Sequence, residues 1–132
     1  MNVLVIDGQG GGLGRQLVAA FSAQCPDIRL VAVGTNSVAA QAMHKAGAQR
    51  AATGENAVVV NCRNADIIVG PIGIVIADAL LGEITPTMAT AVCQSSATRV
   101  PPSASVCSST TAWASCSARP ARSATTAPST TG

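Results

Sequence analysis

The chain has 132 residues, of which 48% are hydrophobic but only 2% aromatic, and its formal net charge is +2. This length predicts one domain. The nearly balanced charge excludes a typical nucleic-acid-binding protein, which carries a strong excess of basic residues. The longest uncharged apolar run, residues 67–77, is too short to cross a membrane, and Asp7 interrupts any apolar leader after Met1. We therefore expect a cytoplasmic protein whose partners include neither nucleic acid nor a membrane.

The chain contains an odd number of cysteines, and no two of them form a Cys-x-x-Cys pair. They are Cys25, Cys62, Cys93, Cys107 and Cys116. This usage is typical of reduced cytosolic thiols and predicts neither a disulfide framework nor a metal site.

The first predicted elements are a buried strand over residues 2–6 and a helix that includes residues 15–21. Between them lies the glycine-rich turn DGQGGGLG, residues 7–14. Such a turn directs free backbone amides and the positive end of the following helix at one point, which suits a phosphate group. The glycines at positions 8, 12 and 14 form a Gly-x-x-x-Gly-x-Gly pattern that resembles the fingerprint of short-chain dehydrogenases.

Further along the chain, apolar runs alternate with helical patterns. The expected order is a strand over residues 28–33, a helix over 37–45, a turn at 53–56, strands over 57–60 and 65–69, and helices over 72–81 and from Pro86 to about Ala97. Strands that alternate with helices predict a Rossmann-like three-layer α/β fold with a small parallel sheet. We assign residues 1–98 to this domain.

The composition changes at residue 99. Of the 34 residues from 99 to 132, 25 are Ser, Thr, Ala or Pro, and the segment carries three arginines and no acid. Such a segment cannot bury enough apolar surface to offset its ordering entropy, so we predict a disordered tail. We interpret it as a frameshifted translation of a GC-rich gene, with a natural disordered tail as the alternative. The last strand of the sheet, expected after Ala97, is then missing or aberrant.

The glycine-rich turn is the strongest candidate binding site. Its predicted ligand contacts are Gly8, Gly10, Gly11, Gly12, Leu13 and Gly14, around the phosphate of a nucleotide, a dinucleotide or another small phosphorylated ligand. The alternative is a tight structural turn without a ligand. Asp7 would either repel a phosphate or cap the turn through backbone amides, and we favour the capping role.

The position that selects the cofactor in dinucleotide-binding folds holds no acid here. Such folds place Asp or Glu about 20 residues after the glycine turn, at the end of the second strand, to bind the ribose 2′-hydroxyl. Residues 34–37 read Gly-Thr-Asn-Ser, in which Asn36 either binds a ribose or caps the next helix. The sequence thus gives no support for NAD as the cofactor and only weak support for NADP. The identity of the cofactor stays open between NAD(P) and another nucleotide.

No set of residues predicts a catalytic centre. The chain has no tyrosine, so the Tyr-x-x-x-Lys pair of short-chain dehydrogenases is absent. Cys62 follows a predicted strand and would be a nucleophile if Arg63 lowered its pKa, but we favour a small buried residue at a strand end. The catalytic residues stay unknown, and the sequence leaves open whether the protein is an enzyme.

Two features after the strand at residues 65–69 predict interactions. Gly70 and Pro71 close that strand and are expected to form the second wall of a ligand cleft, where the strand order reverses. The predicted helix over residues 72–81 is apolar on nearly every face, and a small domain rarely buries such a helix alone. We expect this helix to form a homo-oligomer interface, with burial inside the monomer as the alternative.

Several long motifs resemble those of a small bacterial family of uncharacterised proteins, a domain of unknown function. The motifs are VIDGQGGG at residues 5–12, AVGTNS at 32–37, ATGENA at 52–57, VNCR at 60–63, ADIIVGPIGIVIADALLGEITP at 65–86 and QSSA at 94–97. The resemblance covers residues 3–100 and implies a small cytosolic Rossmann-like protein with no assigned activity. Members of the family continue into a further apolar strand where this chain has its Ser/Thr/Ala-rich tail.

Two functions are compatible with these observations. The first is binding of a nucleotide or another phosphorylated ligand at the glycine turn. The second is a non-enzymatic homo-oligomeric interaction or regulatory module whose glycine turn is structural only. Ligand binding is favoured, because three consecutive glycines exceed what a turn requires.

Overall fold

A computed structural model describes residues 1–100, which form an α/β domain around a five-stranded parallel sheet. In chain order its elements are β1 (Asn2–Asp7), α1 (Gly12–Gln24), β2 (Arg29–Gly34), α2 (Ser37–Lys45), β3 (Arg50–Thr53), α3 (Glu55–Cys62), β4 (Ile67–Val69), the short 3₁₀ helix η1 (Ile72–Val75), α4 (Pro86–Gln94) and β5 (Thr98–Val100). The strands lie side by side in the order β3-β2-β1-β4-β5. This arrangement confirms the predicted Rossmann-like three-layer fold.

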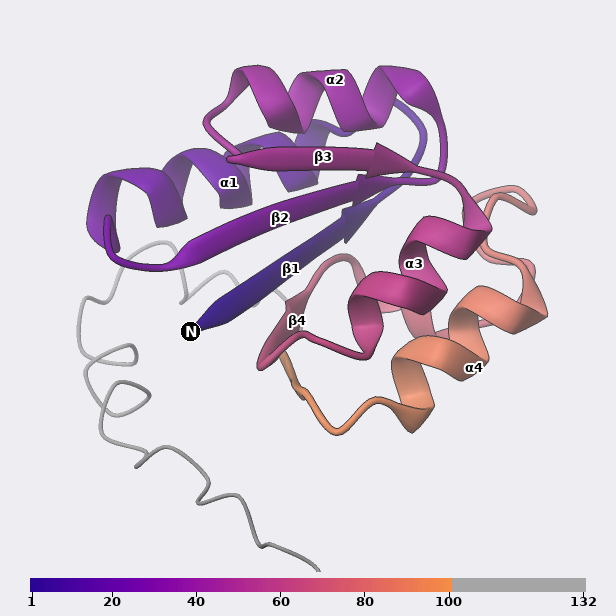
Figure 1. The fold of residues 1–132 in the computed structure, drawn as a ribbon. Coiled ribbons are helices and arrows are strands. Elements are labelled where there is room, and N and C mark those ends of the chain that lie inside the picture. Colours follow the sequence, from indigo (N-terminus) through magenta and orange to yellow (C-terminus); the bar gives the residue numbers. More distant parts are fainter. Residues whose placement is uncertain (101–132) are drawn as a thin grey trace, which may run out of the picture. The chain divides into compact units, whose positions relative to one another are not determined.

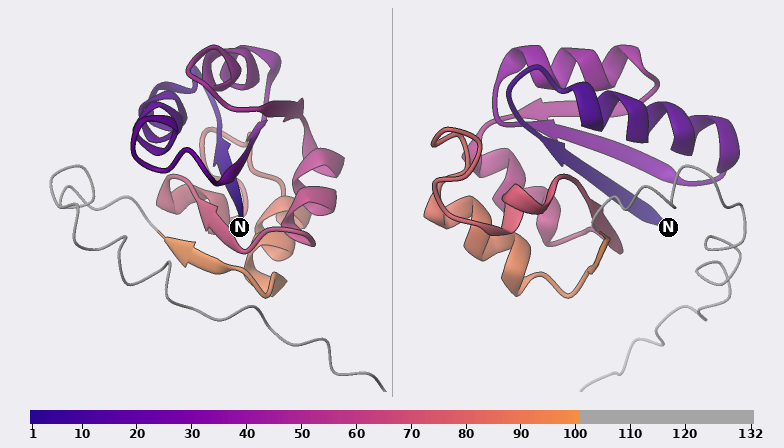
Figure 2. Two further views of the ribbon diagram at one scale, coloured as in Figure 1. Left: turned by 60° about the vertical axis from the view of Figure 1, so that its left-hand side comes forward. Right: turned by 180° about the vertical axis from the view of Figure 1, so that it is seen from behind.

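Helices cover both faces of the sheet. In Figures 1 and 2, α1 and α2 lie on one side of the strands, and α3 and α4 lie on the other. The chain runs from β1 to β3 in one direction along the sheet and then crosses to β4 on the other side of β1. Right-handed crossovers in opposite directions place their helices on opposite faces. No helix in the described residues is long and apolar enough to cross a bilayer.

The core consists of aliphatic side chains that alternate between the two faces of the sheet. Leu4 and Ile6 of β1 belong to a buried cluster with Ile68 of β4. Helices α3 and α4 contribute to this cluster, whose helical members include Val58, Met88, Ala89 and Val92. Val3 and Val5 of β1 are also fully buried, and successive side chains of a strand point to opposite faces. The central strand is therefore covered on both sides, as a parallel sheet requires.

Side-chain caps mark the starts of two helices. The side chain of Asn36 accepts a hydrogen bond from the Ala39 amide at 2.9 Å, and α2 begins at the next residue. Thr85 accepts a hydrogen bond from the Met88 amide at 3.1 Å, and Pro86 occupies the first turn of α4. Local side-chain chemistry thus sets both boundaries.

The predicted strand over residues 57–60 is wrong, because these residues lie inside α3. The third strand is β3, which pairs with β2 through contacts such as Ala32 with Ala51. A short run of apolar β-branched residues fits a buried helix as well as a strand. The backbone turns at Gly54, where φ is 96°, and the helix begins at the next residue.

The predicted helix over residues 72–81 is also wrong. Only η1 is helical, and a series of turns follows it. Asp78, Leu80 and Leu81 have φ angles of 63°, 55° and 59°. Residues with a Cβ adopt this left-handed conformation at a cost, and it ends a right-handed helix. The apolar composition of the segment therefore does not reflect a buried helix.

The strand predicted to be missing or aberrant after Ala97 is present as β5, with three residues in the described part of the chain. It pairs in parallel with β4, so that Arg99 lies beside Ile68. The Arg99 guanidinium donates to carbonyl oxygens at the end of α4, those of Val92, Cys93 and Ser95. These bonds tie the edge strand to the helix that precedes it. Residues 101–132 lie outside the part of the chain that the structure describes. The disorder and frameshift hypotheses concern mainly these residues, so both stay predictions.

Candidate functional site

The glycine loop, residues 8–14, lies at the carboxyl edge of the sheet. It follows β1, which has β2 on one side and β4 on the other, so the strand order reverses here. In open α/β sheets, ligands bind in the crevice outside this point. The arrowheads of β1, β2 and β3 point the same way in Figure 1, and β4 pairs with β1 in parallel, so the segments after β2 and β4 reach this edge too.

Asp7, the last residue of β1, holds the glycine loop in shape. Its carboxylate is buried, with 5% of the residue exposed. The Gly8 amide donates to Oδ1 at 2.8 Å, and the Gly14 amide donates to Oδ2 at 2.6 Å. Asp7 therefore has the capping role that the sequence analysis favoured.

Three glycines of the loop have a structural reason, either a left-handed backbone or close neighbours that a Cβ would crowd. Gly11 has a left-handed φ of 67°. A Cβ at Gly8 would lie 2.7 Å from Oε2 of Glu83, and a Cβ at Gly14 would lie 2.5 Å from the sulfur of Met43. Because Cβ atoms do not approach other atoms so closely, these glycines permit contacts that a larger residue would prevent.

The other two glycines of the loop have no such explanation. A Cβ at Gly10 or at Gly12 would have no atom within 4 Å. Neither residue has a left-handed backbone, and both are exposed. The loop thus presents bare backbone to solvent at two positions where the packing would accept a side chain.

Three amides of the glycine loop have no acceptor within the described residues. Four of its seven amides donate to acceptors in the protein, namely those of Gly8, Gln9, Gly11 and Gly14. The remaining donors belong to Gly10, Gly12 and Leu13. Gly12 and Leu13 open α1, where amides lack partners within the helix and the helix dipole is positive. No residue of the first turn of α1 is acidic, but the Asp7 carboxylate accepts from the Gly14 amide there, so the amides of Gly10, Gly12 and Leu13 are the donors left for an anion.

A carboxylate that the sequence analysis did not select reaches the same edge of the sheet. Glu83 belongs to the β4–α4 connection, which we define as residues 70–85. Its Oε2 accepts hydrogen bonds from the Gln9 amide at 2.7 Å, from Nδ2 of Asn36 at 3.1 Å and from the Thr35 hydroxyl. The Thr35 hydroxyl, and after it the Gln9 amide, lower the pKa of Glu83 below its ordinary value. Glu83 is therefore ionised at neutral pH.

Asn36 connects the loops that follow β1 and β2. While its Oδ1 caps α2, its Nδ2 donates to the Gln9 carbonyl oxygen at 2.9 Å and to Glu83. The helix-capping interpretation is thus confirmed. Contact between Asn36 and a ligand stays a prediction, and its polar atoms are already engaged with the protein.

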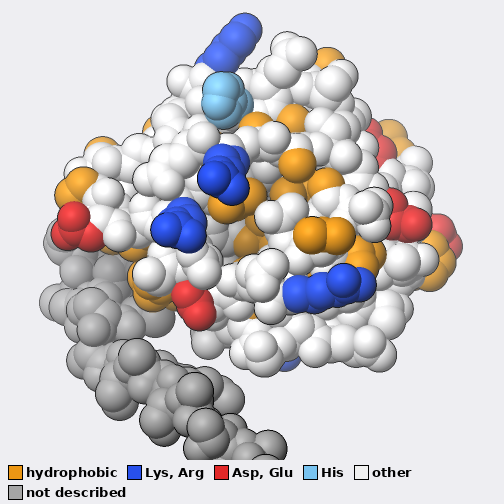
Figure 3. Space-filling model, viewed as in Figure 1, with side chains coloured by type: hydrophobic (Ala, Val, Ile, Leu, Met, Phe, Trp, Pro, Cys, Tyr) orange, Lys and Arg blue, Asp and Glu red, His pale blue; other side chains and the backbone are white. Residues whose placement is uncertain are grey.

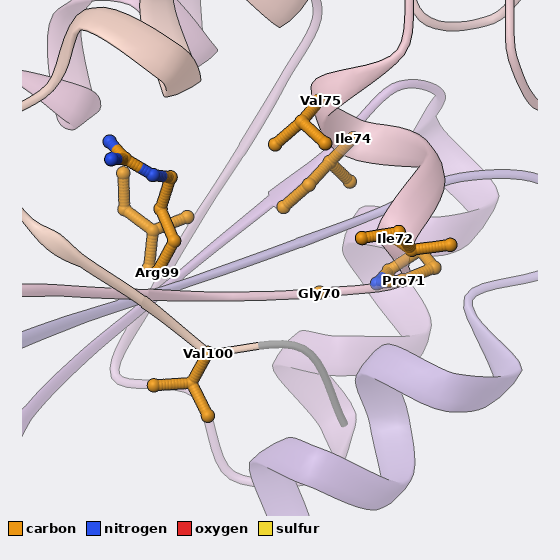
Figure 4. Close-up of a pocket in the computed structure, with 8 residues that line it drawn as sticks. Gly70, Pro71, Ile72, Ile74, Val75, Arg99 and Val100 are labelled. Atoms are coloured by element: carbon orange, nitrogen blue, oxygen red, sulfur yellow. The ribbon is translucent and has the colours of Figure 1, made fainter. Parts of the chain in front are cut away.

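Gly70 and Pro71 end β4 at the same edge and line a small apolar cavity (Figure 4). A Cβ at Gly70 would lie 2.3 Å from the Ile6 carbonyl oxygen, so the ends of β4 and β1 approach closely. In Figure 4, Ile74 points into this space toward Arg99. The cavity measures about 50 Å³, enough for a few waters but far below the size of a nucleotide pocket. A wall formed by Gly70 and Pro71 for a ligand stays a prediction.

The expected position of Cys62 at the end of a strand is wrong, and its surroundings do not favour a nucleophile. Cys62 is the last residue of α3 and does not follow a strand. Its side chain is buried, and burial raises the pKa of the thiol to about 11. Because α3 leads into the start of β4, this residue also lies near the amino edge of the sheet, away from the glycine loop.

Charged side chains are dispersed over the surface. On the face shown in Figure 3, the basic side chains are separated by uncharged surface. Among residues 1–100, no three His, Cys, Asp or Glu side chains come together as a metal site requires. The cation nearest to the glycine loop in the sequence is Arg15, which is exposed on α1.

Glu83 was missed because residues 72–81 were interpreted as a helix. A segment that follows a parallel strand begins at the carboxyl edge of the sheet. Had the β4–α4 connection been recognised as a loop, its acids would have been candidates for the site. The usable signals were Gly73 and Gly82, which are weak helix formers within an apolar run.

Comparison with known protein families places the chain in a family without an assigned function. The family model described as "Domain of unknown function (DUF3842)" matches residues 2–111, a range that contains the glycine loop, Asn36, Gly70 and Glu83. No curated protein and no solved structure matches the chain. Since the family match covers well over half of the 132 residues, the chain belongs to the DUF3842 family of domains of unknown function.

Proposed function

We propose that this protein binds a nucleotide, or another small ligand that carries a phosphate group, at the glycine loop. The phosphate oxygens would accept hydrogen bonds from the amides of Gly10, Gly12 and Leu13. These amides lie at or beside the positive end of α1, which is a favourable place for an anion. The proposal concerns binding and assigns no catalytic residue.

The single observation that carries the proposal is the bare backbone at Gly10 and Gly12. A purely structural turn requires glycine only at positions 8, 11 and 14, where a Cβ would clash or the backbone is left-handed. At Gly10 and Gly12, the remaining explanation for glycine is that a ligand approaches the main chain closely. This observation favours a ligand site over a turn that is structural only.

The proposal is tested by a thermal-shift screen against nucleotides, coenzymes and sugar phosphates. A ligand that binds only the folded state raises the unfolding midpoint in a concentration-dependent way. We then expect Gly12→Val to abolish the shift, because the new side chain would cover the free amides. The fold of this variant should survive, since a Cβ at Gly12 has no atom within 4 Å.

The matched control is Ala19→Val, which adds the same side chain at an exposed position further along α1. It should leave the ligand-induced shift intact and report any general cost of valine in this helix. If Gly12→Val responds to the ligand as strongly as the control does, the glycine loop is not the binding site. If no compound in the screen shifts the parent, the structural interpretation of the loop is favoured.

We also propose that the chain forms a homo-oligomer through residues 72–81. Three of the six exposed large hydrophobic residues in the described part of the chain, Ile72, Ile76 and Leu81, belong to this segment, and Leu81 is 96% exposed. An interface would bury these side chains, and Ile76→Glu would place an unpaired charge in it at a cost of several kcal/mol (about 2–5). Light scattering tests this point, because a parent that is monomeric at micromolar concentration contradicts it.

A cytoplasmic location completes the proposal. The cysteines within the described residues, Cys25, Cys62 and Cys93, are free thiols. Free thiols are typical of a reducing compartment. Fractionation of the source cells would test the location directly.

A further inference from the structure

The Glu83 carboxylate lies between the glycine loop and the segment that follows β2. Its Oε2 lies so close to Gly8 that a Cβ there would be 2.7 Å away. The three donors to this oxygen come from the two segments that follow β1 and β2. In dinucleotide-binding folds, this is the region in which an acidic residue meets the ribose of the ligand. Here the acid comes from the β4–α4 connection and not from β2.

The position of the Glu83 carboxylate is fixed from both ends. On the side-chain end, the Gln9 amide, the Thr35 hydroxyl and Nδ2 of Asn36 all donate to one oxygen. On the backbone end, turns hold the connection in place through hydrogen bonds such as that from Glu83 N to the Leu80 carbonyl oxygen at 3.3 Å. A carboxylate held in this way is preorganised, so a ligand that used it would not have to order it first.

The second carboxylate oxygen, Oε1, has no hydrogen bond within the described residues. An ionised carboxylate only accepts hydrogen bonds. It therefore attracts a hydroxyl or another donor and repels a phosphate. This edge of the sheet thus combines free backbone donors at the start of α1 with a fixed acceptor beside β2.

We propose that Glu83 is the specificity-determining residue of the glycine-loop site, where Oε1 accepts hydrogen bonds from the vicinal hydroxyls of a sugar. The ligand is then a sugar phosphate or a nucleotide whose ribose diol is unmodified. A ligand with a second phosphate at the ribose 2′ position is disfavoured, because that phosphate would face the carboxylate. This inference rests on the proposed function, since it requires a phosphate-bearing ligand at the glycine loop.

The inference reverses the preference drawn from the sequence. The absence of an acid at residues 34–37 left room for a 2′-phosphate. In the structure, Glu83 provides a carboxylate at Thr35 and Asn36, which are two of those positions. The acid that appeared to be missing is supplied from a position nearly 50 residues further along the chain.

The test compares three probes that differ only at the ribose 2′ position: AMP, 2′-deoxy-AMP and adenosine 2′,5′-bisphosphate. Isothermal titration calorimetry at constant ionic strength gives the dissociation constant of each probe for the full chain. A hydrogen bond to a charged group corresponds to a factor of about 10 or more in affinity. We expect the parent to prefer AMP over each of the other two probes by about that factor.

Glu83→Gln removes the charge while it keeps the side chain near its original size. We expect this variant to bind adenosine 2′,5′-bisphosphate more tightly than the parent does, so that its preference for AMP falls to within about threefold. Asp27→Asn is the matched control, because it removes one negative charge from an exposed residue in the turn before β2, at the opposite edge of the sheet. Preferences in this control should equal those of the parent.

The outcomes separate the two proposals. If the parent binds all three probes with equal affinity, or if Glu83→Gln keeps the parental preference, the role of Glu83 is overturned while nucleotide binding stands. If none of the probes binds the parent, binding of an adenine nucleotide at the glycine loop falls, and the role of Glu83 toward the ribose of such a ligand falls with it. Should Glu83→Gln fail to fold, Thr35→Val provides a second variant. It removes one donor that holds the carboxylate, and it should weaken the discrimination without a change in net charge.

Discussion

The glycine loop and the β4–α4 connection meet at one edge of the sheet, and they are held in place in different ways. The glycine loop takes its shape from Asp7, whose two hydrogen-bonded amides lie one and seven residues away. The β4–α4 connection is anchored through Glu83, whose partners lie 47 to 74 residues away. A local pattern therefore predicts the loop, whereas only the folded chain reveals the connection. This difference also predicts how each region responds to mutation.

The largest expected effect comes from the buried anchor of the glycine loop. Asp7→Ala would leave the Gly8 and Gly14 amides without an acceptor, and Gly14 is buried. Because buried donors without partners are costly, we expect the free energy of unfolding to fall by about 2–4 kcal/mol. Urea denaturation measures this change directly.

The control for this experiment is Asp66→Ala. Asp66 also accepts a backbone hydrogen bond, from the Asn2 amide at 2.7 Å, but at an exposed position. Water can replace this partner, so the expected loss is below about 1 kcal/mol. Equal losses for the two variants would contradict the assignment of Asp7 as the anchor of the loop.

A smaller loss of stability is expected at Gly8, where the glycine loop touches the β4–α4 connection, than at Asp7. At Gly10, where the loop has no such contact, almost no loss is expected. Gly8→Ala would place a Cβ within 3 Å of Glu83, Thr35 and Leu80, so we expect a loss of about 1–3 kcal/mol from overpacking. Gly10→Ala meets no atom within 4 Å and should stay within about 0.5 kcal/mol of the parent. Unfolding curves of the two alanine variants, measured side by side, check this ranking. A Gly10→Ala variant as unstable as Gly8→Ala would mean that the glycines are there for packing alone.

The same contrast explains which parts of the fold are visible in the sequence. β1, α1 and α2 carry their signals locally, as an apolar strand, a glycine turn and an Asn36 cap. Residues 57–60 carry an apolar β-branched pattern that both a strand and a buried helix satisfy. The choice of helix depends on β3, because the chain needs a crossover between β3 and β4.

The candidate site divides in a similar way. The loop glycines can be selected from the sequence, but which of them are structural depends on Met43, Glu83 and the backbone angle at Gly11. Glu83 has no neighbour in the sequence that marks it as part of the site. Its role arises from the left-handed turns at Asp78, Leu80 and Leu81, which no residue preference predicts.

The smallest expected effect is the pH dependence that Glu83 adds to stability. Hydrogen bonds from Thr35 and Gln9 lower the pKa of Glu83 in the folded state below its ordinary value of 4.5. The folded state thus favours the ionised form, so the stabilisation is fully present above pH 4.5. It is lost as the pH falls through the lowered pKa of the folded state.

Glu83→Gln does not titrate, so the stability advantage of the parent over this variant should shrink as the pH falls from about 6 to about 3. Urea denaturation of both proteins across this range measures the difference. A difference that stays constant, or grows in acid, would show that the crevice does not favour the charged carboxylate, and it would remove the ionic anchor of the β4–α4 connection.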